Sequence, residues 1–330
     1  MDGDLTHGGA LDVVRQRFQS APSPWLDLST GVNPFAYPHI QVSRAAMEDL
    51  PTRAMAENCR SAIATALDAP RDSVVLAPGS ELLIRLLPTM MKPQKVVVHK
   101  PTYGDHKTVW EEAGCQVIES DDPLQCSEFA DAVVLCNPNN PDGRLFSPAD
   151  LESVRSRLAL RGGWLIVDEA YADLCPSVSL ARSGGRDGLI ILRSFGKFYG
   201  LAGIRLGAML APFSLRLLIE KRLGSWPVSG AALEVGTRAY NDAEWSVNMR
   251  AILATARARL DRRLERRGLK IRGGTDLFRL IETPDAHRLW HHLARQGVYV
   301  RRFGWSPDVL RIGIPADEKD EDRLENALSI

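Results

Sequence analysis

The sequence predicts an α/β protein whose larger part is built on a mostly parallel sheet, followed by a smaller α+β domain. Short runs of β-branched and aliphatic residues alternate with helix-like stretches between about residues 73 and 210, and the runs end in Gly, Pro or Asn. Unbroken apolar runs suit strands that are buried on both faces, which is typical of parallel sheets covered by helices. The expected strands lie at 74–76, 96–98, 133–135, 164–167 and 189–192.

The ends of the chain differ from this central region and divide it into three parts. Residues 1–43 contain Gly8-Gly9 and Asn33-Pro34, so we expect an irregular arm with one short helix. Residues 44–232 form the expected large domain. Residues 233–330 form the smaller α+β domain, which contains an Arg-rich helical stretch at about 249–267. Its further segments are expected at 271–281, 285–296 (a helix), 298–302 and 310–314 (strands).

Charge and thiol content exclude several classes of protein. The 330 residues carry 41 basic and 41 acidic side chains, and a chain without net charge lacks the field that draws nucleic acids. The Arg-rich stretch also holds acidic residues and is interpreted as a solvated face. Five cysteines that never form a Cys-x-x-Cys pair predict reduced thiols, with neither a disulfide framework nor a metal site. The expected partner is a small molecule.

The chain gives no sign of membrane insertion or export. Its acidic N-terminus leads into no apolar segment, which argues against a secretory signal. No apolar run approaches the roughly 18 residues that a membrane span needs. We therefore expect a cytoplasmic protein that makes no contact with membranes.

The first chemical signal is Lys197, in a glycine-rich loop directly after the expected strand at 189–192. A loop lysine is ordinarily a solvated charge. Here Phe195 and Phe198 flank it, and their apolar surroundings could leave its amine neutral and nucleophilic. Ser194 and Arg205, on either side of the lysine, could bind an anion. The loop therefore indicates a covalent attachment point beside an anion site.

Polar residues also follow two earlier strands. Asp168 closes the strand at 164–167, where an acidic residue could simply cap the next helix, but with Lys197 nearby it could keep a pyridinium nitrogen protonated. Tyr171 could hydrogen-bond a ring oxygen. Asn140 lies in a loop rich in Asn and Pro, which is adequate as a plain turn and could also place a donor on the same oxygen.

Two further motifs suit a planar, phosphorylated ligand. Gly79, Ser80 and Glu81 follow a strand and open a helix, which is the arrangement that presents free backbone N–H groups to a phosphate. Tyr103 follows the next strand and offers an aromatic ring that could stack on a planar cofactor. Since the carboxyl ends of parallel strands meet at one edge of a sheet, these motifs are expected to converge there.

Together these motifs resemble the aspartate-aminotransferase superfamily of pyridoxal-phosphate enzymes, fold type I. The resemblance runs from Gly79 to Arg311 in the superfamily's order. It implies a seven-stranded-type sheet, a homodimer, and catalytic roles for Lys197, Asp168 and Tyr103, with Lys197 holding the cofactor covalently. The implied cofactor contacts are Gly79, Ser80, Glu81, Tyr103, Asn140, Asp168, Tyr171, Ser194, Lys197 and Arg205.

The N-terminal arm narrows the resemblance. Its Thr6-His7-Gly8-Gly9 and Trp25 to Pro34 segments are similar to the arm of the threonine-phosphate decarboxylases of cobalamin synthesis, aerobic route. That similarity implies a phosphorylated amino-acid substrate, L-threonine O-3-phosphate, and loss of CO2 to give (R)-1-amino-2-propanol O-2-phosphate. The implied substrate contacts are His7, Gly8, Gly9, Gly31, Asn33, Asn140, Arg301 and Arg311.

Two other readings stay open at this point. Histidinol-phosphate aminotransferases use the same catalytic residues, but they typically carry a Tyr-Pro pair where this chain has Leu50-Pro51. A noncatalytic regulator on a transaminase fold usually adds a DNA-binding domain, for which the chain has no spare length. The resemblance therefore favours the decarboxylase over both.

Overall fold

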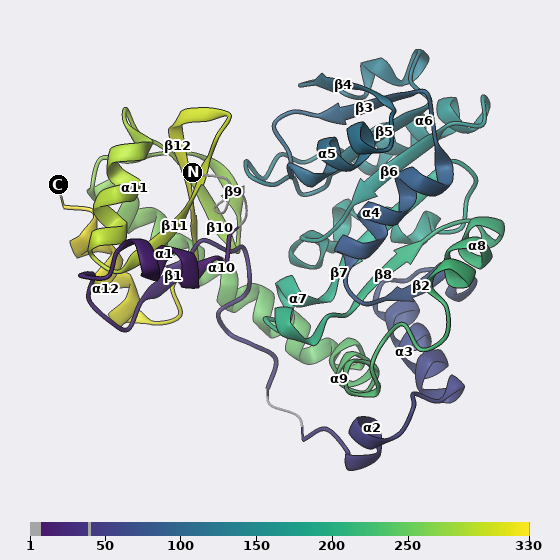
Figure 1. Ribbon diagram of the computed structural model, residues 1–330, viewed down its shortest axis with the longest axis horizontal. Helices are drawn as coiled ribbons and strands as arrows, with labels where there is room; N and C mark the ends of the chain where they lie inside the picture. The colour runs from purple at the N-terminus through teal and green to yellow at the C-terminus, as the bar shows by residue number, and fades with distance from the viewer. Residues whose placement is uncertain (1–7, 39–40, 330) are drawn as a thin grey trace. The chain divides into compact units, whose positions relative to one another are not determined.

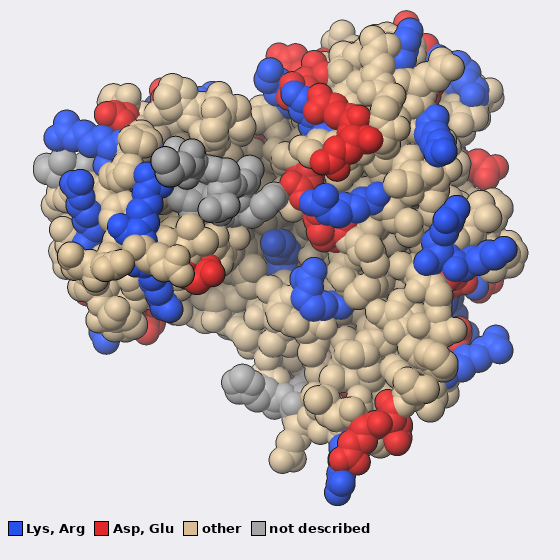
Figure 2. All heavy atoms as spheres, viewed as in Figure 1, with Lys and Arg blue, Asp and Glu red and all other residues tan. Residues whose placement is uncertain are grey.

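The computed structural model describes residues 8–38 and 41–329, which form two compact units. One unit comprises residues 36–246, and the other combines the chain up to residue 35 with residues 247–330. Within the described residues no helix is both long and apolar enough to cross a membrane. Acidic and basic side chains both occur on the face drawn in Figure 2, as the neutral composition predicts.

The larger unit is built around a seven-stranded sheet of order β2-β8-β7-β6-β5-β3-β4 (Figure 1). One strand, β8, runs opposite to the other six, and all pairs that do not involve β8 are parallel. This confirms the predicted, mostly parallel sheet. The strands are β2 Val74–Ala77, β3 Lys95–His99, β4 Gln116–Ser120, β5 Ala132–Cys136, β6 Trp164–Asp168, β7 Leu189–Ser194 and β8 Gly207–Leu210. The helices are α2 Arg44–Glu48, α3 Arg53–Ala66, α4 Ser80–Met91, α5 Asp105–Glu112, α6 Pro148–Ala159, α7 Phe195–Phe198, α8 Phe213–Leu223 and α9 Gly230–Asn241.

The apolar runs of the sequence become strands because helices bury them. Every residue of β5 is buried, and α4, α5 and α8 pack against one face of the sheet through a shared apolar cluster. Side-chain caps fix where the helices start: Ser147 accepts from the Asp150 amide at the beginning of α6, and Ser229 accepts from the Ala232 amide at the beginning of α9. The strand ends that carry the polar motifs are thereby held in register.

The smaller unit holds a five-stranded sheet of order β1-β11-β12-β10-β9. The strand β1 comes from the N-terminal arm and pairs in parallel with β11, so the arm is an integral part of this unit's sheet. The strands are β1 Leu26–Leu28, β9 Lys270–Thr275, β10 Phe278–Glu282, β11 Val298–Phe303 and β12 Ser306–Gly313. The helices are α1 Leu11–Arg17, α10 Ala243–Arg266, α11 Ala286–Arg295 and α12 Glu318–Ala327.

The boundaries between the units differ from the sequence-based ones at 43 and 233. Helix α9 packs along α3, so residues 233–241 belong to the larger unit. The division instead falls near the beginning of α10, at residue 246, and in the arm at residue 35. Sequence patterns locate a helix, but they do not reveal which sheet the helix covers.

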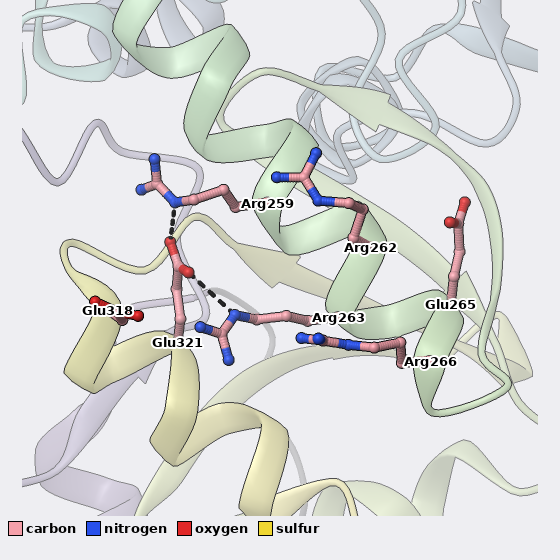
Figure 3. Close-up of a pocket in the computed structure, with 7 residues that line it drawn as sticks. All are labelled: Arg259, Arg262, Arg263, Glu265, Arg266, Glu318 and Glu321. Atoms are coloured by element: carbon pink, nitrogen blue, oxygen red, sulfur yellow. Dashed lines mark hydrogen bonds and ion pairs between the residues drawn. The ribbon is translucent and has the colours of Figure 1, made fainter.

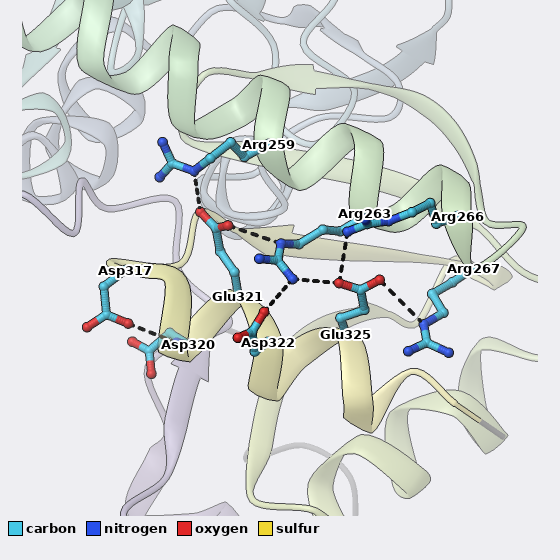
Figure 4. A network of polar contacts seen from close by, with 9 residues as sticks. All are labelled: Arg259, Arg263, Arg266, Arg267, Asp317, Asp320, Glu321, Asp322 and Glu325. Atoms are coloured by element: carbon cyan, nitrogen blue, oxygen red, sulfur yellow. Dashed lines mark hydrogen bonds and ion pairs between the residues drawn. The ribbon is translucent and has the colours of Figure 1, made fainter.

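The Arg-rich helix α10 is tied to α12 by a network of ion pairs (Figure 4). Glu321 is 1% exposed and accepts hydrogen bonds from Arg259 Nε at 2.7 Å and Arg263 Nε at 3.0 Å. Arg263 also pairs with Asp322 at 2.7 Å and Glu325 at 2.5 Å. The arginines of this face therefore meet acidic partners, so the face is more extensively paired than a purely solvated one.

A hollow of about 800 Å³ adjoins this network (Figure 3). Glutamates stand among the arginines that line it, and the buried one, Glu321, pairs with two of them. The lining residues are Arg259, Arg262, Arg263, Arg266, Glu265, Glu318 and Glu321. Because the opposite charges largely balance, we assign the hollow a structural role.

Removing the Glu321 carboxylate should destabilise the protein. Glu321→Ala leaves Arg259 without this acceptor and empties a buried position, at an expected cost of about 1–3 kcal/mol in the free energy of unfolding. Chemical denaturation measures the change. Glu318→Ala is the matched control, since Glu318 lines the same hollow on the same helix but is exposed. Equal stability of the two variants would contradict a structural role for Glu321.

Candidate active site

The carboxyl ends of the central strands gather the polar motifs around one pocket. Cys136 at the end of β5 and Asp168 at the end of β6 are register partners, and β7 leads directly into α7, which carries Lys197. The pocket has a volume of about 270 Å³. Its lining consists of Ser80, Glu81, Ile84, Tyr103, Cys136, Asn140, Asp168, Ala170, Tyr171, Ser194, Lys197 and Arg205. The structure thus brings the expected cofactor contacts together, with Gly79 adjoining them through Arg205.

One end of the pocket is shaped to receive an anion. Helix α4 begins at Ser80, and no side chain caps its first amides, so their N–H groups stay available. Gly79 has φ +89°, and a Cβ there would lie 2.6 Å from Arg205 Nη2. A Cβ at Gly207 would lie 2.4 Å from the Ser80 amide nitrogen. The absence of both side chains lets the guanidinium and the helix start approach the same place.

Asp168 is held by two hydrogen bonds on the floor of the pocket. Its Oδ2 lies 3.0 Å from His106 Nε2, and its Oδ1 accepts from the Ala170 amide at 3.0 Å. His106 is 1% exposed. Burial lowers the pKa of His106, but the neighbouring Cys136 and Asp168 outweigh burial and raise that pKa to about 10. His106 is therefore cationic at neutral pH and faces the Asp168 carboxyl group as a charged hydrogen-bond partner.

Sequence reasoning missed His106 and Cys136. Nothing in the pattern of apolar residues marks either one, although His106 follows Tyr103 by three residues, and the two rings pack edge to face with centroids 5.8 Å apart. The ligand atoms of His106, Cys136 and Asp168 lie within 4.8 Å of one another, a spacing that a metal ion could bridge. His106 and Asp168 are already joined by a direct hydrogen bond, so neither side chain needs a metal ion as its partner.

Tyr103 is oriented by acidic residues at the edge of the pocket. Its hydroxyl donates to Glu81 Oε2 at 3.1 Å and lies 3.3 Å from Asp105 Oδ2. Arg85 bridges the two carboxylates, at 2.7 Å from Glu81 and 2.8 Å from Asp105. Burial is the main cause that raises the pKa of both Tyr103 and Glu81. Glu81 therefore helps to fix the orientation of the Tyr103 ring, which is expected to stack on the cofactor.

Aromatic packing fixes the helical turn that carries Lys197. Tyr199 is stacked between Phe195, at 4.5 Å between ring centroids, and Trp245, at 5.5 Å. Tyr37 donates its amide to the Tyr199 carbonyl at 2.8 Å and packs edge-on against both Tyr199 and Trp245. The turn therefore has little freedom to move relative to the sheet.

A buried ion-pair cluster joins the ends of the neighbouring strands β6 and β7. Arg193 on β7 bonds Glu169 at 2.9 Å and also pairs with Asp173. Glu169 accepts in addition from the Leu180 amide at 2.7 Å. All these charges are paired where water is excluded, so breaking one partner would leave an uncompensated buried charge. The cluster locks the segment after Asp168 to the strand before Lys197.

The expected substrate residues, apart from Asn140, lie in the smaller unit or outside the described residues. His7 is among the latter. Gly9 donates its amide to Ser29 Oγ at 2.8 Å, and a Cβ at Gly8 would lie 2.4 Å from the Ser29 carbonyl oxygen. Arg311 is buried, donates to that same carbonyl at 2.8 Å and is the register partner of Arg301. The structure therefore gathers Gly8, Gly9 and Arg311 around Ser29.

The two remaining arm residues of the predicted substrate site lie in the loop after β1. Gly31 is buried. Asn33 accepts from the Phe35 amide through its Oδ1 at 2.8 Å, so its side chain shapes the loop. This local bond gives Asn33 a conformational role beside the predicted contact with substrate.

Comparison with known proteins identifies the family. Residues 23–329 match the model described as aminotransferase class I and II. The chain belongs to this family. It is 38% identical to the threonine-phosphate decarboxylase of Pseudomonas aeruginosa, over 98% of this chain and 97% of that protein. It is also 38% identical to the one from Sinorhizobium sp., over 100% and 99%. Identity to the histidinol-phosphate aminotransferase of Symbiobacterium thermophilum is 30%, over 87% and 84%.

Solved structures share the fold. The histidinol-phosphate aminotransferase from Sinorhizobium meliloti in complex with pyridoxal-5'-phosphate aligns with a TM-score of 0.82 and 19% identity, over 96% of this chain and 92% of that one. The L-threonine-O-3-phosphate decarboxylase from Porphyromonas gingivalis aligns with a TM-score of 0.75 and 17% identity, over 91% and 97%. Both likenesses establish fold type I. This family member is a pyridoxal-phosphate-dependent enzyme. The hypothesis of a noncatalytic regulator on a transaminase fold is therefore rejected.

The residues of the pocket fit pyridoxal phosphate. Uncapped helix amides and Arg205 suit the phosphate dianion, and the close approach of Arg205 to Gly79 leaves no room for a larger residue. The carboxyl group of Asp168 suits a protonated ring nitrogen. Lys197 offers the amine that binds an aldehyde. We infer that these residues, with Asn140 and Tyr171 toward the ring oxygen, hold the cofactor.

Replacing Gly79 by Ala should weaken binding of pyridoxal phosphate about tenfold or more, which corresponds to ~1.4 kcal/mol. The added methyl group would displace Arg205 and strain a backbone with φ +89°. Titration of the cofactor absorbance measures the affinity. Gly104→Ala is the matched control, because φ there is −59° and a Cβ would meet nothing within 4 Å. Equal affinity of both variants would contradict the anion cradle.

Replacing His106 by Asn should flatten the alkaline dependence of stability. The pKa of His106 rises from 6.5 to about 10 on folding, so its charge stabilises the fold fully below pH 6.5. This contribution is lost as the pH rises through about 10. Thermal unfolding without added cofactor should show the wild-type protein losing more stability than His106→Asn over this interval. Parallel curves for the two proteins would refute a cationic His106.

Proposed function

We propose that this enzyme decarboxylates L-threonine O-3-phosphate to (R)-1-amino-2-propanol O-2-phosphate. The observation that carries the proposal is the 38% identity, over nearly the whole of both chains, to two threonine-phosphate decarboxylases. The match to a histidinol-phosphate aminotransferase is weaker and covers less of each chain. Gly8, Gly9 and Arg311, three of the residues proposed to bind the substrate, all contact Ser29 and so lie close together.

The residues of the pocket divide the chemical work. Bound pyridoxal phosphate supplies an electron sink for negative charge that develops at the substrate Cα. Asp168, with cationic His106 behind it, holds the proton on the ring nitrogen. The Ser80 amide and Arg205 bind the cofactor phosphate, while Asn140 and Tyr171 orient the ring. The amine of Lys197 lies in the same pocket and can carry a proton to and from Cα.

The choice of bond is a matter of orientation. Loss of CO2 requires the substrate to be held with its carboxylate in the orientation that lets the Cα–carboxylate bond break. CO2 would then leave, and a protonated Lys197, which takes its proton from solvent, would deliver that proton to Cα. We propose that Arg301, Arg311 and the Gly8-Gly9 segment anchor the substrate phosphate and carboxylate in this orientation. An aminotransferase would instead expose the Cα–H bond to the same lysine.

The expected setting of the reaction follows the same resemblance. The product would serve as the precursor of the nucleotide-loop linker of cobalamin. We further propose that the enzyme acts as a cytoplasmic homodimer, since fold type I sites are commonly completed by a second subunit.

The test is a decarboxylation assay without any keto acid. Purified protein, reconstituted with pyridoxal phosphate and given L-threonine O-3-phosphate, should release CO2 and the amine product in equal amounts. Lys197→Ala should abolish turnover, and Arg311→Lys should lower kcat/KM for decarboxylation about tenfold or more, since a lysine lacks the guanidinium geometry that is proposed to anchor and orient the substrate. A protein that releases no CO2 and transfers the amino group of histidinol phosphate to a keto acid would be an aminotransferase.

A further inference from the structure

Two histidines on the surface of α11 point their ring nitrogens at each other. His287 and His291 are four residues apart on this helix, and their Nε2 atoms are 3.2 Å apart. Their ring centroids are separated by 4.4 Å. His287 is exposed, whereas His291 is half-buried against Phe18 and Trp290. Neither histidine lines the cofactor pocket, and the proposed function leaves both without a role.

The spacing of the two nitrogens is that of two ligands on one metal ion. Bonds of about 2.0–2.1 Å from zinc to nitrogen, at a tetrahedral angle, place the two nitrogens about 3.3 Å apart. Histidines at positions i and i+4 of a helix share one face and are a known chelating pair. The observed distance of 3.2 Å therefore needs almost no movement of the side chains.

The contact between the two rings is compatible with metal binding. A ligand imidazole must be neutral. The two Nε2 atoms lie at hydrogen-bond distance, which lets one ring donate to the other when both are neutral. Metal binding needs only a tautomer change in the donor ring and no net loss of a proton.

We propose that His287 and His291 form a binding site for one divalent transition-metal ion of the Cu²⁺, Ni²⁺ or Zn²⁺ class, with water completing the coordination. Imidazole ligands suit these ions, whereas Mg²⁺ and Ca²⁺ require oxygen ligands. Because His291 packs against Phe18 at the end of α1, the bound ion also fixes the arm against α11. The site therefore stabilises the smaller unit when metal is present.

The basic surroundings give the site a distinctive salt dependence. Arg17, Arg302 and Arg295, whose positive charges act on His291, also repel a cation, and dissolved salt weakens this repulsion. Raising the concentration of a weakly coordinating salt should therefore strengthen metal binding. A site built from carboxylates would show the opposite trend.

Calorimetric titration of Ni²⁺ into the full-length holoenzyme, prepared without a polyhistidine tag, tests the proposal. We expect one ion per chain, a rise in the melting temperature of the protein, and an affinity that increases with salt. His287→Ala and His291→Ala should each lower the affinity at least tenfold. His292→Ala is the matched control, because His292 is the next residue of the same helix and lies outside the pair.

His287→Ala is the decisive variant, since its exposed side chain can be removed without disturbing the packing of Phe18. Unchanged Ni²⁺ affinity in this variant, or an equal loss in His292→Ala, would overturn the proposal. An affinity that falls with salt would also overturn it. Because catalysis is not measured, these outcomes are independent of whether the enzyme is a decarboxylase.

Discussion

The hydrogen bond between His106 and Asp168 is the interaction on which the rest of the site depends. His106 is buried and cationic, and its Nε2 lies 3.0 Å from Asp168 Oδ2. This contact fixes the direction in which the Asp168 carboxyl group presents itself to the pocket that it lines. A carboxyl group held in this way suits a protonated ring nitrogen of the cofactor.

The sheet turns this single interaction into a site. Cys136 and Asp168 are register partners at the ends of β5 and β6, so they lie at the same edge of the sheet. Helix α5 places His106 beside them. Arg193, buried with Glu169 and Asp173, joins the end of β6 to β7 and so fixes the distance from Asp168 to the turn that carries Lys197. Stiffness at these strand ends matters because proton transfer and ring binding both require fixed geometry.

The parts that the sequence predicted are those governed by local chemistry. Unbroken apolar runs identified the central strands, and the residue types at their ends identified Lys197, Asp168 and the Gly79 turn, because phosphate, ring nitrogen and aldehyde each need a particular group. His106 escaped prediction because its role depends on what lies opposite its helix in space. The pairing of β1 with β11 escaped for the same reason: three arm residues carry no signal for a partner about 270 residues away.

The division of labour between the units explains why the reaction type is hard to infer from the catalytic residues. Decarboxylation and amino transfer use the same lysine, carboxylate and cofactor, all of which lie in the larger unit. The residues expected to orient the substrate, including Arg301 and Arg311, lie in the smaller unit with the arm. We propose that anion binding by these residues selects the bond that breaks. Identity to the decarboxylases over the whole chain, arm included, carries more weight for this reason than conservation of the pocket alone would.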